Sequence, residues 1–471
     1  MDTSKSLKRD GHSSLERRRE PMAARAAAGR ERRDTVPLDA HAELVVPTGR
    51  ASALSILQAE DADRLQDLVP IRYGRMLATP FTFLRGSAAV MAADLAAGPR
   101  TDLTVQLCGD AHLSNFGMFS SPERRLVFDV NDFDETLPGP FEWDVKRLAA
   151  SVVVAGRNNQ FDKKTNRKLA RATTAAYRET IARASKMNPL DVFYYRLDVE
   201  DLSKTLETAK SDRRRLAKTR KKSARKNSLG ALGKLTDIVD GRRVIVSNPP
   251  LIVAMSDEQR RAEMTQIEAF FGEYRATLPA DRGQLMDRYS MTDIARKVVG
   301  VGSVGTRCLI ALLESGDGDP LFLQIKEAAP SVLEAHLAPS GFDQEGHRVV
   351  DGQRKIQATP DALVGWARYE RADESTDFYV RQLWDGKASA DVETMTAEVL
   401  RRYAKACGAA LGRAHARSGD ASMISGYLGD DDTFDRAVAR FAEAYADRTE
   451  QDYDELIGAV DDGRVPIVRD L

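Results

Sequence analysis

The segment from residue 108 to residue 135 constrains the fold and chemistry of this chain more than any other part of the sequence. It reads CGDAHLSNFGMFSSPERRLVFDVNDFDE. Asp110 and Asn115 lie on a short polar stretch, and residues 126–130 form an apolar run typical of a β-strand. Three further aspartates end or follow that run: Asp129, Asp132 and Asp134. Because carboxylates in a folded chain must stay hydrated, pair with a cation or bind a metal, we expect this segment to belong to a functional site.

The composition narrows the classes of protein that fit the sequence. The 471 residues carry a net charge of −1, with 42% apolar and 30% charged residues. This soluble composition is long enough for two or three domains, and the near-neutral charge argues against nucleic acid as a partner. The three cysteines are far apart, which argues against a zinc site or a disulfide framework. No apolar run approaches the length of a membrane span, so the sequence predicts a cytoplasmic protein without a membrane partner.

Two regions are rich in basic residues. Residues 1–45 have few large apolar side chains, and we expect them to form a basic, disordered tail. Residues 210–227 hold ten Lys or Arg in eighteen positions. This segment could bind a polyanion such as RNA, or it could be a solvated basic helix or a mobile insertion. The absence of interleaved aromatic residues favours the solvated segment.

A glycine-bearing turn and a lysine form the second informative feature. Three glycines, Gly300, Gly302 and Gly305, flank Ser303, and β-like residues follow from 307 to 313. A dinucleotide-binding fold would instead need a helix directly after the glycines. After a further turn, an apolar strand over residues 321–326 ends in a lysine, Lys326. Glycines let backbone N–H groups approach phosphates, and a lysine neutralises them, although a tight β-turn with a solvent-facing lysine has the same pattern.

These two features fit one reaction when they are taken together. Phosphoryl transfer needs a carboxylate near the acceptor, oxygen ligands for Mg²⁺, and backbone groups plus a lysine around the phosphates. Asp110, Asn115 and Asp132 supply the first two requirements. The glycine turn and Lys326 supply the third. The alternative is two unrelated modules that each carry half of the motif.

Five segments of the chain resemble one bacterial family. They are GDAHLSNFG, FDVNDFDE, FEWDVKRLAAS, RKVVGVGSVGT and LQIKEA. The resemblance is to the domain of unknown function 2252 family, which is grouped with the protein-kinase-like superfamily, and it covers roughly residues 45–460. It implies a kinase-like fold but brings no established substrate.

Within that superfamily, the aminoglycoside-phosphotransferase branch looks most similar, with a catalytic loop of the form HGDxxxxN. The resemblance implies that Cys108 takes the place of the histidine, that Asp110 is the catalytic aspartate and that Asn115 binds metal. His112 would contact the acceptor or a phosphate, or it would be a structural histidine of the loop. Asp144 resembles the aspartate that begins the helix beneath the loop, where it could cap the helix or hold a neighbouring loop.

The same resemblance assigns the remaining metal ligands. Asp132 corresponds to the metal-binding aspartate, and Asp134 would assist it. Asp129 is the competing assignment, because the sequence does not determine how the preceding strand runs.

The order of the motifs differs from that of ordinary kinases, because the catalytic loop precedes the glycine turn. We therefore expect an α+β, two-lobed, circularly permuted kinase-like fold with a small antiparallel β lobe and a large, mostly helical lobe. Residues 46–285 would form most of the large lobe and residues 286–387 the small lobe. Residues 388–471 would return as helices to the large lobe.

The small lobe supplies the expected nucleotide contacts. Tyr379 and Val380 lie on the strand expected to form the hinge between the lobes, where they would contact the nucleotide. Kinases pair the phosphate-binding lysine with a glutamate, and here Glu334 is the favoured partner of Lys326, with Glu345 as the other candidate.

The expected function is therefore an ATP- and Mg²⁺-dependent phosphotransferase. Its acceptor would be the hydroxyl group of a small molecule or of a protein. A regulatory pseudokinase that binds nucleotide without turnover, and a nucleotidyltransferase on the same scaffold, are the two alternatives.

Overall fold

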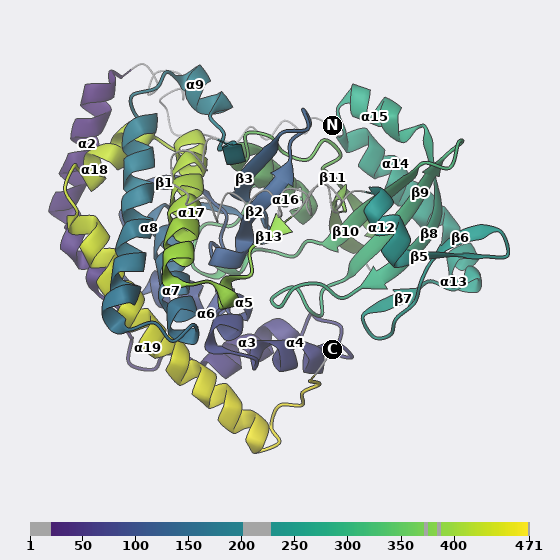
Figure 1. Cartoon of the computed structure of the whole chain (residues 1–471), viewed down its shortest axis with the longest axis horizontal. Helices are drawn as coiled ribbons and strands as arrows, with labels where there is room; N and C mark the ends of the chain where they lie inside the picture. Colours follow the sequence, from purple (N-terminus) through teal and green to yellow (C-terminus); the bar gives the residue numbers. More distant parts are fainter. Residues whose placement is uncertain (1–19, 201–227, 372–374, 384–387, 470–471) are drawn as a thin grey trace, which may run out of the picture.

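The fold is α+β. The computed structural model describes residues 20–200, 228–371, 375–383 and 388–469. Figure 1 shows long helices gathered on one side and a six-stranded antiparallel sheet on the other. Within these ranges, no helix is both long enough and apolar enough to cross a bilayer. The basic segment 210–227 lies outside the described residues.

Four long helices form the helical side. They are α7 (Glu142–Asn158), α8 (Lys163–Ala184), α17 (Ala397–Ser418) and α19 (Thr433–Asp461). The backbones of α8 and α17 approach closely because α17 carries glycine at their contact. A Cβ atom at Gly408 would lie only 2.2 Å from the carbonyl oxygen of Thr173. The chain after residue 396 thus packs against helices formed more than two hundred residues earlier.

The N-terminal region is more ordered than we expect from its composition. Helix α2 (Met22–Thr35) packs against α18 (Ala421–Leu428), and η1 (Leu38–Ala42) contacts α19. Arg33 donates from Nε to the carbonyl oxygen of Tyr427 at 2.7 Å. The prediction of a disordered tail is therefore wrong from residue 22 onward, because small residues allow α2 to pack closely although it has few large apolar side chains. Residues 1–19 lie outside the described part of the chain.

Four short helices connect the helical side to the sheet. They are α3 (Ala53–Asp61), α4 (Val69–Met76), α5 (Pro80–Gly86) and α6 (Ala88–Ala96). A reciprocal capping box between Thr79 and Thr82 starts α5. Val301, from the glycine turn, is buried in the core that α3, α4 and α5 share with α19.

The segment 108–135 folds as a hairpin between two paired strands. Strand β1 (Thr104–Leu107) enters the segment and pairs with β4 (Leu137–Pro140), which leaves it. Between them lie the short helix η2 (Leu113–Asn115) and strands β2 (Phe116–Ser120) and β3 (Leu126–Val130), with β13 (Ala388–Ser389) beside β2. Because β1 pairs with β4, the polar stretch after β1 lies beside the acidic stretch before β4.

The six-stranded sheet has the order β11-β12-β10-β9-β8-β7. Its strands are β7 (Ile252–Ala254), β8 (Tyr289–Lys297), β9 (Cys308–Ser315), β10 (Pro320–Glu327), β11 (Gly365–Glu370) and β12 (Ser375–Gln382). The predicted strand after the glycine turn and the predicted strand that carries Lys326 are confirmed as β9 and β10, and β8 precedes the turn. Lys326 lies opposite both Cys308 and Tyr379.

The β side begins earlier in the chain than residue 286, the predicted boundary. Helix α12 (Ser228–Leu235), the hairpin of β5 (Thr236–Val239) and β6 (Arg242–Ile245), and β7 all lie on this side. Helices α13 (Asp257–Ala262), α14 (Met264–Thr277) and α15 (Ala280–Met286) follow, and α14 packs on β11. Helical periodicity in a segment therefore does not show that the segment belongs to the helical side.

One of the remaining helices, α16, contacts both sides. Helix α16 (Glu345–Ile356) contacts β11, β12 and α17, while η3 (Val332–Ala335), η4 (Val392–Thr394) and α9 (Pro189–Tyr194) are short.

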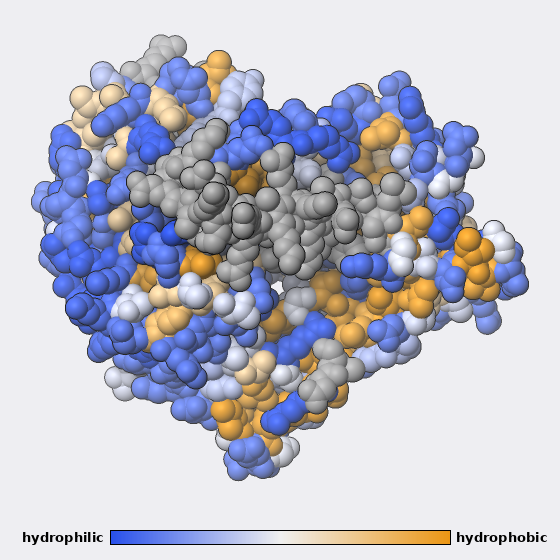
Figure 2. Space-filling model, viewed as in Figure 1, coloured by the Kyte–Doolittle hydropathy of each residue, from blue (hydrophilic) through white to orange (hydrophobic). Residues whose placement is uncertain are grey.

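Figure 2 shows hydrophobic side chains exposed at the end of the β5–β6 hairpin, where Ile238 and Val239 are 61% and 52% exposed.

Candidate functional site

A cavity of about 340 Å³ lies where the glycine turn meets the hairpin of residues 108–135. Its walls come from that hairpin, from the turn between β8 and β9, and from the region of helices α3 to α5. The predicted site residues that line it are Asp110, His112, Asn115, Asp132, Asp134, Gly300, Gly302 and Ser303. Two groups of residues far apart in sequence therefore share one cavity.

The polar stretch after β1 is held in place from the first turn of α7. Asp144 accepts hydrogen bonds from the backbone N–H groups of Cys108 at 2.8 Å and Gly109 at 3.1 Å. His415 on α17 places its Nε2 atom 3.2 Å from the same carboxylate. The predicted role of Asp144 in holding a neighbouring loop is confirmed, and the loop is anchored to two of the long helices.

Asp110 is fixed by three neighbours. Arg147 on α7 donates from Nε to its carboxylate at 2.5 Å, and Asn115 donates from Nδ2 to its carbonyl oxygen at 2.8 Å. His112 Nε2 lies 3.4 Å from the other carboxylate oxygen. Burial alone would raise the pKa of Asp110, but the charge of Arg147 and the neighbouring His112 hold that pKa below its ordinary value. Asp110 is therefore a fixed hydrogen-bond acceptor at neutral pH.

His112 is neutral and buried. Its burial, together with the charges of Arg85 and Arg147, lowers its pKa to about 3 despite the nearby carboxylate of Asp110. The side chain is 3% exposed, and its Nδ1 atom has no hydrogen-bond partner among the described residues. A buried ring nitrogen without a partner is unusual in a purely structural histidine.

The acidic stretch meets the sheet through Asp134. Lys326 donates from Nζ at 2.5 Å, the hydroxyl of Tyr379 donates at 2.7 Å and the hydroxyl of Ser303 at 3.3 Å. Asp132 lies 3.5 Å from the same Nζ atom. Burial disfavours charge on both partners, but their attraction holds the pKa of Asp134 below its ordinary value and raises that of Lys326. Both groups are charged, and they join the two halves of the site.

The competing metal ligand, Asp129, faces away from this cavity. It forms a buried ion pair at 2.5 Å with Arg413 of α17, whose other nitrogen donates to the carbonyl oxygen of Ile356. This pair occupies the carboxylate of Asp129 in the core. Of the two alternatives, only Asp132 lines the cavity.

The expected glutamate partner of Lys326 is not found in the part of the chain that the structure describes. Glu334 caps η3 through the N–H of Ser331 and lies 3.9 Å from Arg348 on α16. Glu345 pairs with the same arginine at 2.5 Å. The preferred pairing with Glu334 is therefore wrong, because Arg348 attracts both glutamates while Asp132 and Asp134 pair with the lysine.

Neighbouring residues of β12 face opposite sides of the sheet. Tyr379 lies opposite Lys326 and reaches Asp134 with its hydroxyl group. Val380 lies opposite Ile325, and its fully buried side chain belongs to the hydrophobic core around Phe270. The Val380 side chain therefore does not line the site, because side chains alternate between the two faces of a strand.

The glycine turn is fixed through its carbonyl groups. Arg64 donates to the carbonyl oxygens of Gly302 and Val304, both at 2.8 Å, and Arg75 donates to that of Gly300 at 2.7 Å. Gly300 has a φ of 69° and Gly305 a φ of 94°, which favour glycine.

The N–H groups of the same turn remain available. Those of Val301, Gly302 and Ser303 have no hydrogen-bond partner among the described residues. Three consecutive N–H groups beside a cavity form a natural anion-binding site.

The carboxylates of the cavity are oxygen ligands of the kind that bind Mg²⁺. Among the described residues, no group of three His, Cys, Asp or Glu side chains is placed to hold a metal by itself. Asp132 and Asp134 offer two carboxylates, and Asn115 adds an amide. This set suits Mg²⁺, which proteins hold through one or two carboxylates while substrate phosphates and water complete the shell.

Sequence reasoning missed the arginines that organise the site. Arg147 lies three residues after Asp144 on α7, so the two share a helix face, and this spacing could have identified it. Arg348 donates to the carbonyl oxygens of Thr136, Asp134 and Ala329 from a position over two hundred residues beyond the hairpin. No local pattern marks such a contact.

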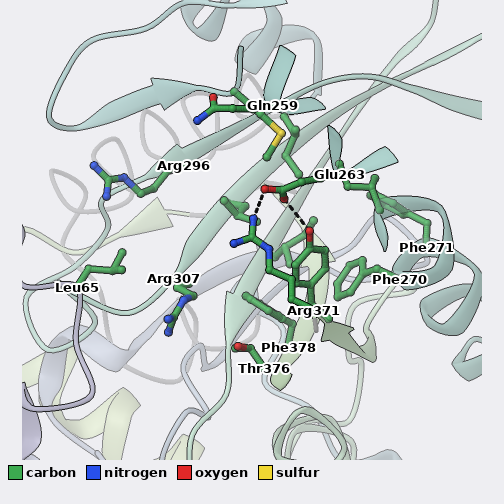
Figure 3. Close-up of a pocket in the computed structure, with 16 residues that line it drawn as sticks. Leu65, Gln259, Glu263, Phe270, Phe271, Arg296, Arg307, Arg371, Thr376 and Phe378 are labelled. Carbon is green, nitrogen blue, oxygen red and sulfur yellow. Dashed lines mark hydrogen bonds and ion pairs between the residues drawn. The ribbon is translucent and has the colours of Figure 1, made fainter. Parts of the chain in front are cut away.

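A second cavity of about 340 Å³ lies on the other face of the sheet (Figure 3). Aromatic side chains form much of its wall, and Figure 3 shows Glu263 beside the side chain of Arg371. The tyrosine hydroxyl donates to that carboxylate at 2.6 Å, and Arg371 forms an ion pair with it. None of the predicted site residues lines this second cavity.

One comparison with known proteins gave a match. The profile of a family described as an uncharacterized protein conserved in bacteria, domain of unknown function 2252, matches residues 64–459. No curated protein and no solved structure matches the chain. The match covers the hairpin, the glycine turn and both sides of the fold.

Proposed function

Because the chain belongs to this uncharacterized bacterial family, we propose a function from the site itself: an ATP- and Mg²⁺-dependent phosphotransferase. One observation carries the proposal. The glycine turn and the acidic hairpin line a single cavity, and Asp134 in its wall pairs with Lys326 across 192 positions of sequence. Phosphoryl transfer needs these parts together: carboxylates, a lysine, and backbone N–H groups around the phosphates.

Each part has a place in the proposed reaction. The N–H groups of Val301, Gly302 and Ser303 bind phosphate oxygens, and Lys326 neutralises their charge. Asp132, Asp134 and Asn115 hold Mg²⁺, which offsets the charge that develops on the phosphates.

Asp110 orients the hydroxyl group of the acceptor. The acceptor oxygen bonds to the γ-phosphorus of ATP while the bond from that phosphorus to the departing ADP oxygen breaks. The hydroxyl proton passes to the carboxylate of Asp110. Its depressed pKa makes Asp110 a weak base, which suits a loose transition state in which the proton leaves late.

The proposal includes a circularly permuted kinase-like fold. The antiparallel sheet with its glycine turn and Lys326 takes the role of the small lobe. The helical side takes the role of the large lobe, and α17 supplies the helix that precedes the catalytic loop in unpermuted kinases. Exposed termini make such a rearrangement physically reasonable.

Thermal unfolding with Mg–ATP tests the nucleotide site. We expect millimolar Mg–ATP to raise the unfolding temperature of the wild type but not of Lys326→Ala or Asp132→Ala. Arg371→Gln, in the second cavity, is the control and should respond as the wild type does. A wild type that shows no shift contradicts the proposal.

Labelled nucleotide separates the three chemistries. Incubation with γ-labelled ATP and a metabolite extract should label an acceptor, whereas α-labelled ATP should not. Transfer of the α label would instead indicate a nucleotidyltransferase. Binding of Mg–ATP without transfer of either label would indicate a regulatory pseudokinase.

A further inference from the structure

Arg85 lines the same cavity as Asp110, and its guanidinium lies 6.0 Å from the ring centre of Phe81 but beside no paired carboxylate among the described residues. It lies in the last turn of α5 and lines the cavity. Its guanidinium forms no ion pair or hydrogen bond within the described residues, and its Nε atom is buried. Burial lowers the pKa of Arg85, and the carboxylates of Asp110 and Glu393 offset this only in part. A partly buried guanidinium that has no acidic partner favours the binding of an anion.

A second unpartnered group lies at the same end of the cavity. His112 is almost fully buried, and its Nδ1 atom has no partner among the residues the structure describes. Arg85, His112 and Asp110 line the same cavity, and His112 Nε2 lies 3.4 Å from the carboxylate of Asp110. A charged donor, a neutral imidazole and a fixed carboxylate thus surround one part of the cavity.

This group differs from the residues assigned to the phosphates of ATP. Lys326 is paired with Asp132 and Asp134 at the sheet, and the free N–H groups belong to the glycine turn. Arg147 donates both to the carboxylate of Asp110 at 2.5 Å and to the carbonyl oxygen of Leu84, the residue before Arg85, at 2.8 Å. Arg85 therefore lies on the side of the cavity near Asp110, where the proposed reaction places the acceptor.

We propose that the acceptor carries an acidic group, a carboxylate or a phosphate, that binds Arg85 while its hydroxyl group lies at Asp110. His112 hydrogen-bonds the same molecule through Nδ1. The identification of the bound molecule as an acceptor rests on the proposed phosphotransferase function. The anion site at Arg85 rests on its own geometry. It restricts the substrates to hydroxyl compounds that already bear a negative charge, such as hydroxy acids or phosphate monoesters.

Protection from an arginine reagent tests the anion site without knowledge of the acceptor. We expect millimolar inorganic phosphate to slow phenylglyoxal labelling of Arg85, followed by peptide mass spectrometry, by about fivefold or more. The protection should persist when Mg²⁺ and a non-hydrolysable ATP analogue are bound. Arg30, exposed on α2, is the control and should label equally with and without phosphate.

The result of the labelling separates the two sources of an anion. If the ATP analogue alone shields Arg85 and phosphate adds nothing, the arginine binds the γ-phosphate and the proposal is overturned. Absence of protection by phosphate also overturns it. Protection by phosphate in a protein that shows no thermal response to Mg–ATP would keep the anion site and reject the phosphotransferase.

Kinetics with a fractionated extract test the acceptor class directly. Transfer from γ-labelled ATP should occur with the compounds that an anion exchanger retains, and acceptors found only in the flow-through would contradict the proposal. With the active fraction, Arg85→Gln should raise the KM for the acceptor by roughly 30- to 100-fold without changing that for Mg–ATP, and Arg85→Lys should recover part of the loss. If no fraction is labelled, the protection experiment alone decides.

Discussion

The two cavities have similar volumes and lie on opposite faces of one sheet, yet their chemistry differs. We call the cavity lined by Asp110 and the glycine turn the inner cavity, and the second cavity, beside Glu263, the outer cavity. Neighbouring residues of β10 contribute to different cavities: Ile325 lines the outer cavity, and Lys326 contacts Asp134 of the inner cavity. In the outer cavity, the charges are paired at the rim, Glu263 with Arg371 and Arg296 with Asp67. The inner cavity instead keeps polar atoms without partners.

This difference indicates that the outer cavity belongs to the packing of the protein and the inner cavity to its function. A buried polar group without a partner costs free energy, and a folded chain retains few of them without a reason. The inner cavity holds such atoms on His112, on Arg85 and in the glycine turn. The comparison predicts that changes at the outer cavity alter stability alone, and that changes at the inner cavity alter ligand binding and turnover.

The largest expected effect is on stability, at the outer cavity. Phe270→Ala removes a buried ring that contacts Phe271, Tyr369 and Phe378, and we expect a loss of about 3–5 kcal/mol in the free energy of unfolding. Urea unfolding measures the loss. The affinity of the folded variant for Mg–ATP should match that of the wild type, and a loss of affinity would break the comparison.

The next effect is on turnover, at the inner cavity. Lys326→Met should lower kcat by about 10²–10³-fold, because the charge that neutralises the phosphates is lost. Rates of transfer from γ-labelled ATP measure the effect. The matched control is Arg371→Met, which removes an ion-paired cation from the outer cavity and should leave kcat unchanged. Equal losses in the two variants would contradict the assignment of the inner cavity.

A matched pair of hydroxyl deletions sharpens the comparison. Tyr379→Phe and Tyr369→Phe each remove a hydrogen bond to a carboxylate, at 2.7 Å to Asp134 and 2.6 Å to Glu263. Each should cost about 1–2 kcal/mol of unfolding free energy. Only Tyr379→Phe should also weaken Mg–ATP binding in isothermal titration calorimetry, since only its carboxylate belongs to the proposed metal site.

The smallest expected effect is a pH dependence. Burial raises the pKa of Glu135, which lines the inner cavity, to about 7 from an ordinary value of 4.5, although the N–H of Val332 favours its charged form. The folded state therefore binds more protons than the unfolded state between these values, and stability should fall as pH rises through that window.

Replacing this carboxylate isolates its contribution. Glu135→Gln should remove up to about 1.4 kcal/mol per pH unit from the slope of unfolding free energy against pH between about pH 5 and pH 7. Urea unfolding at a series of pH values measures the slope. A variant with the slope of the wild type would show that Glu135 does not titrate in this range.

Local patterns in the sequence were enough to find residues that the fold brings together. The spacing of Asp110 and Asn115, the acids after β3 and the lysine at the end of β10 are features of short segments. Their placement around one cavity agrees with the prediction that the two halves belong together. The α+β class was also predictable, because helical and alternating periodicities are both present.

The contacts that fix the site could not be predicted, because they join distant parts of the chain. Arg413 is 284 positions from Asp129, and Arg348 is 214 positions from Asp134. The face of β12 that carries Tyr379 depends on its register with β10, which no local pattern specifies. The same limit explains the wrong assignment of Glu334 and the misplaced start of the β side.

The distance along the chain between Asp134 and Lys326 has a consequence for biosynthesis. Lys326 leaves the ribosome 192 residues after its partner, which corresponds to roughly 10–40 s at ordinary rates of translation. During that interval the acidic hairpin has neither its lysine nor its tyrosine, and its carboxylates depend on water and cellular cations. The nascent chain thus spends this time with these carboxylates unpaired with Lys326, and completion of the sheet supplies that partner.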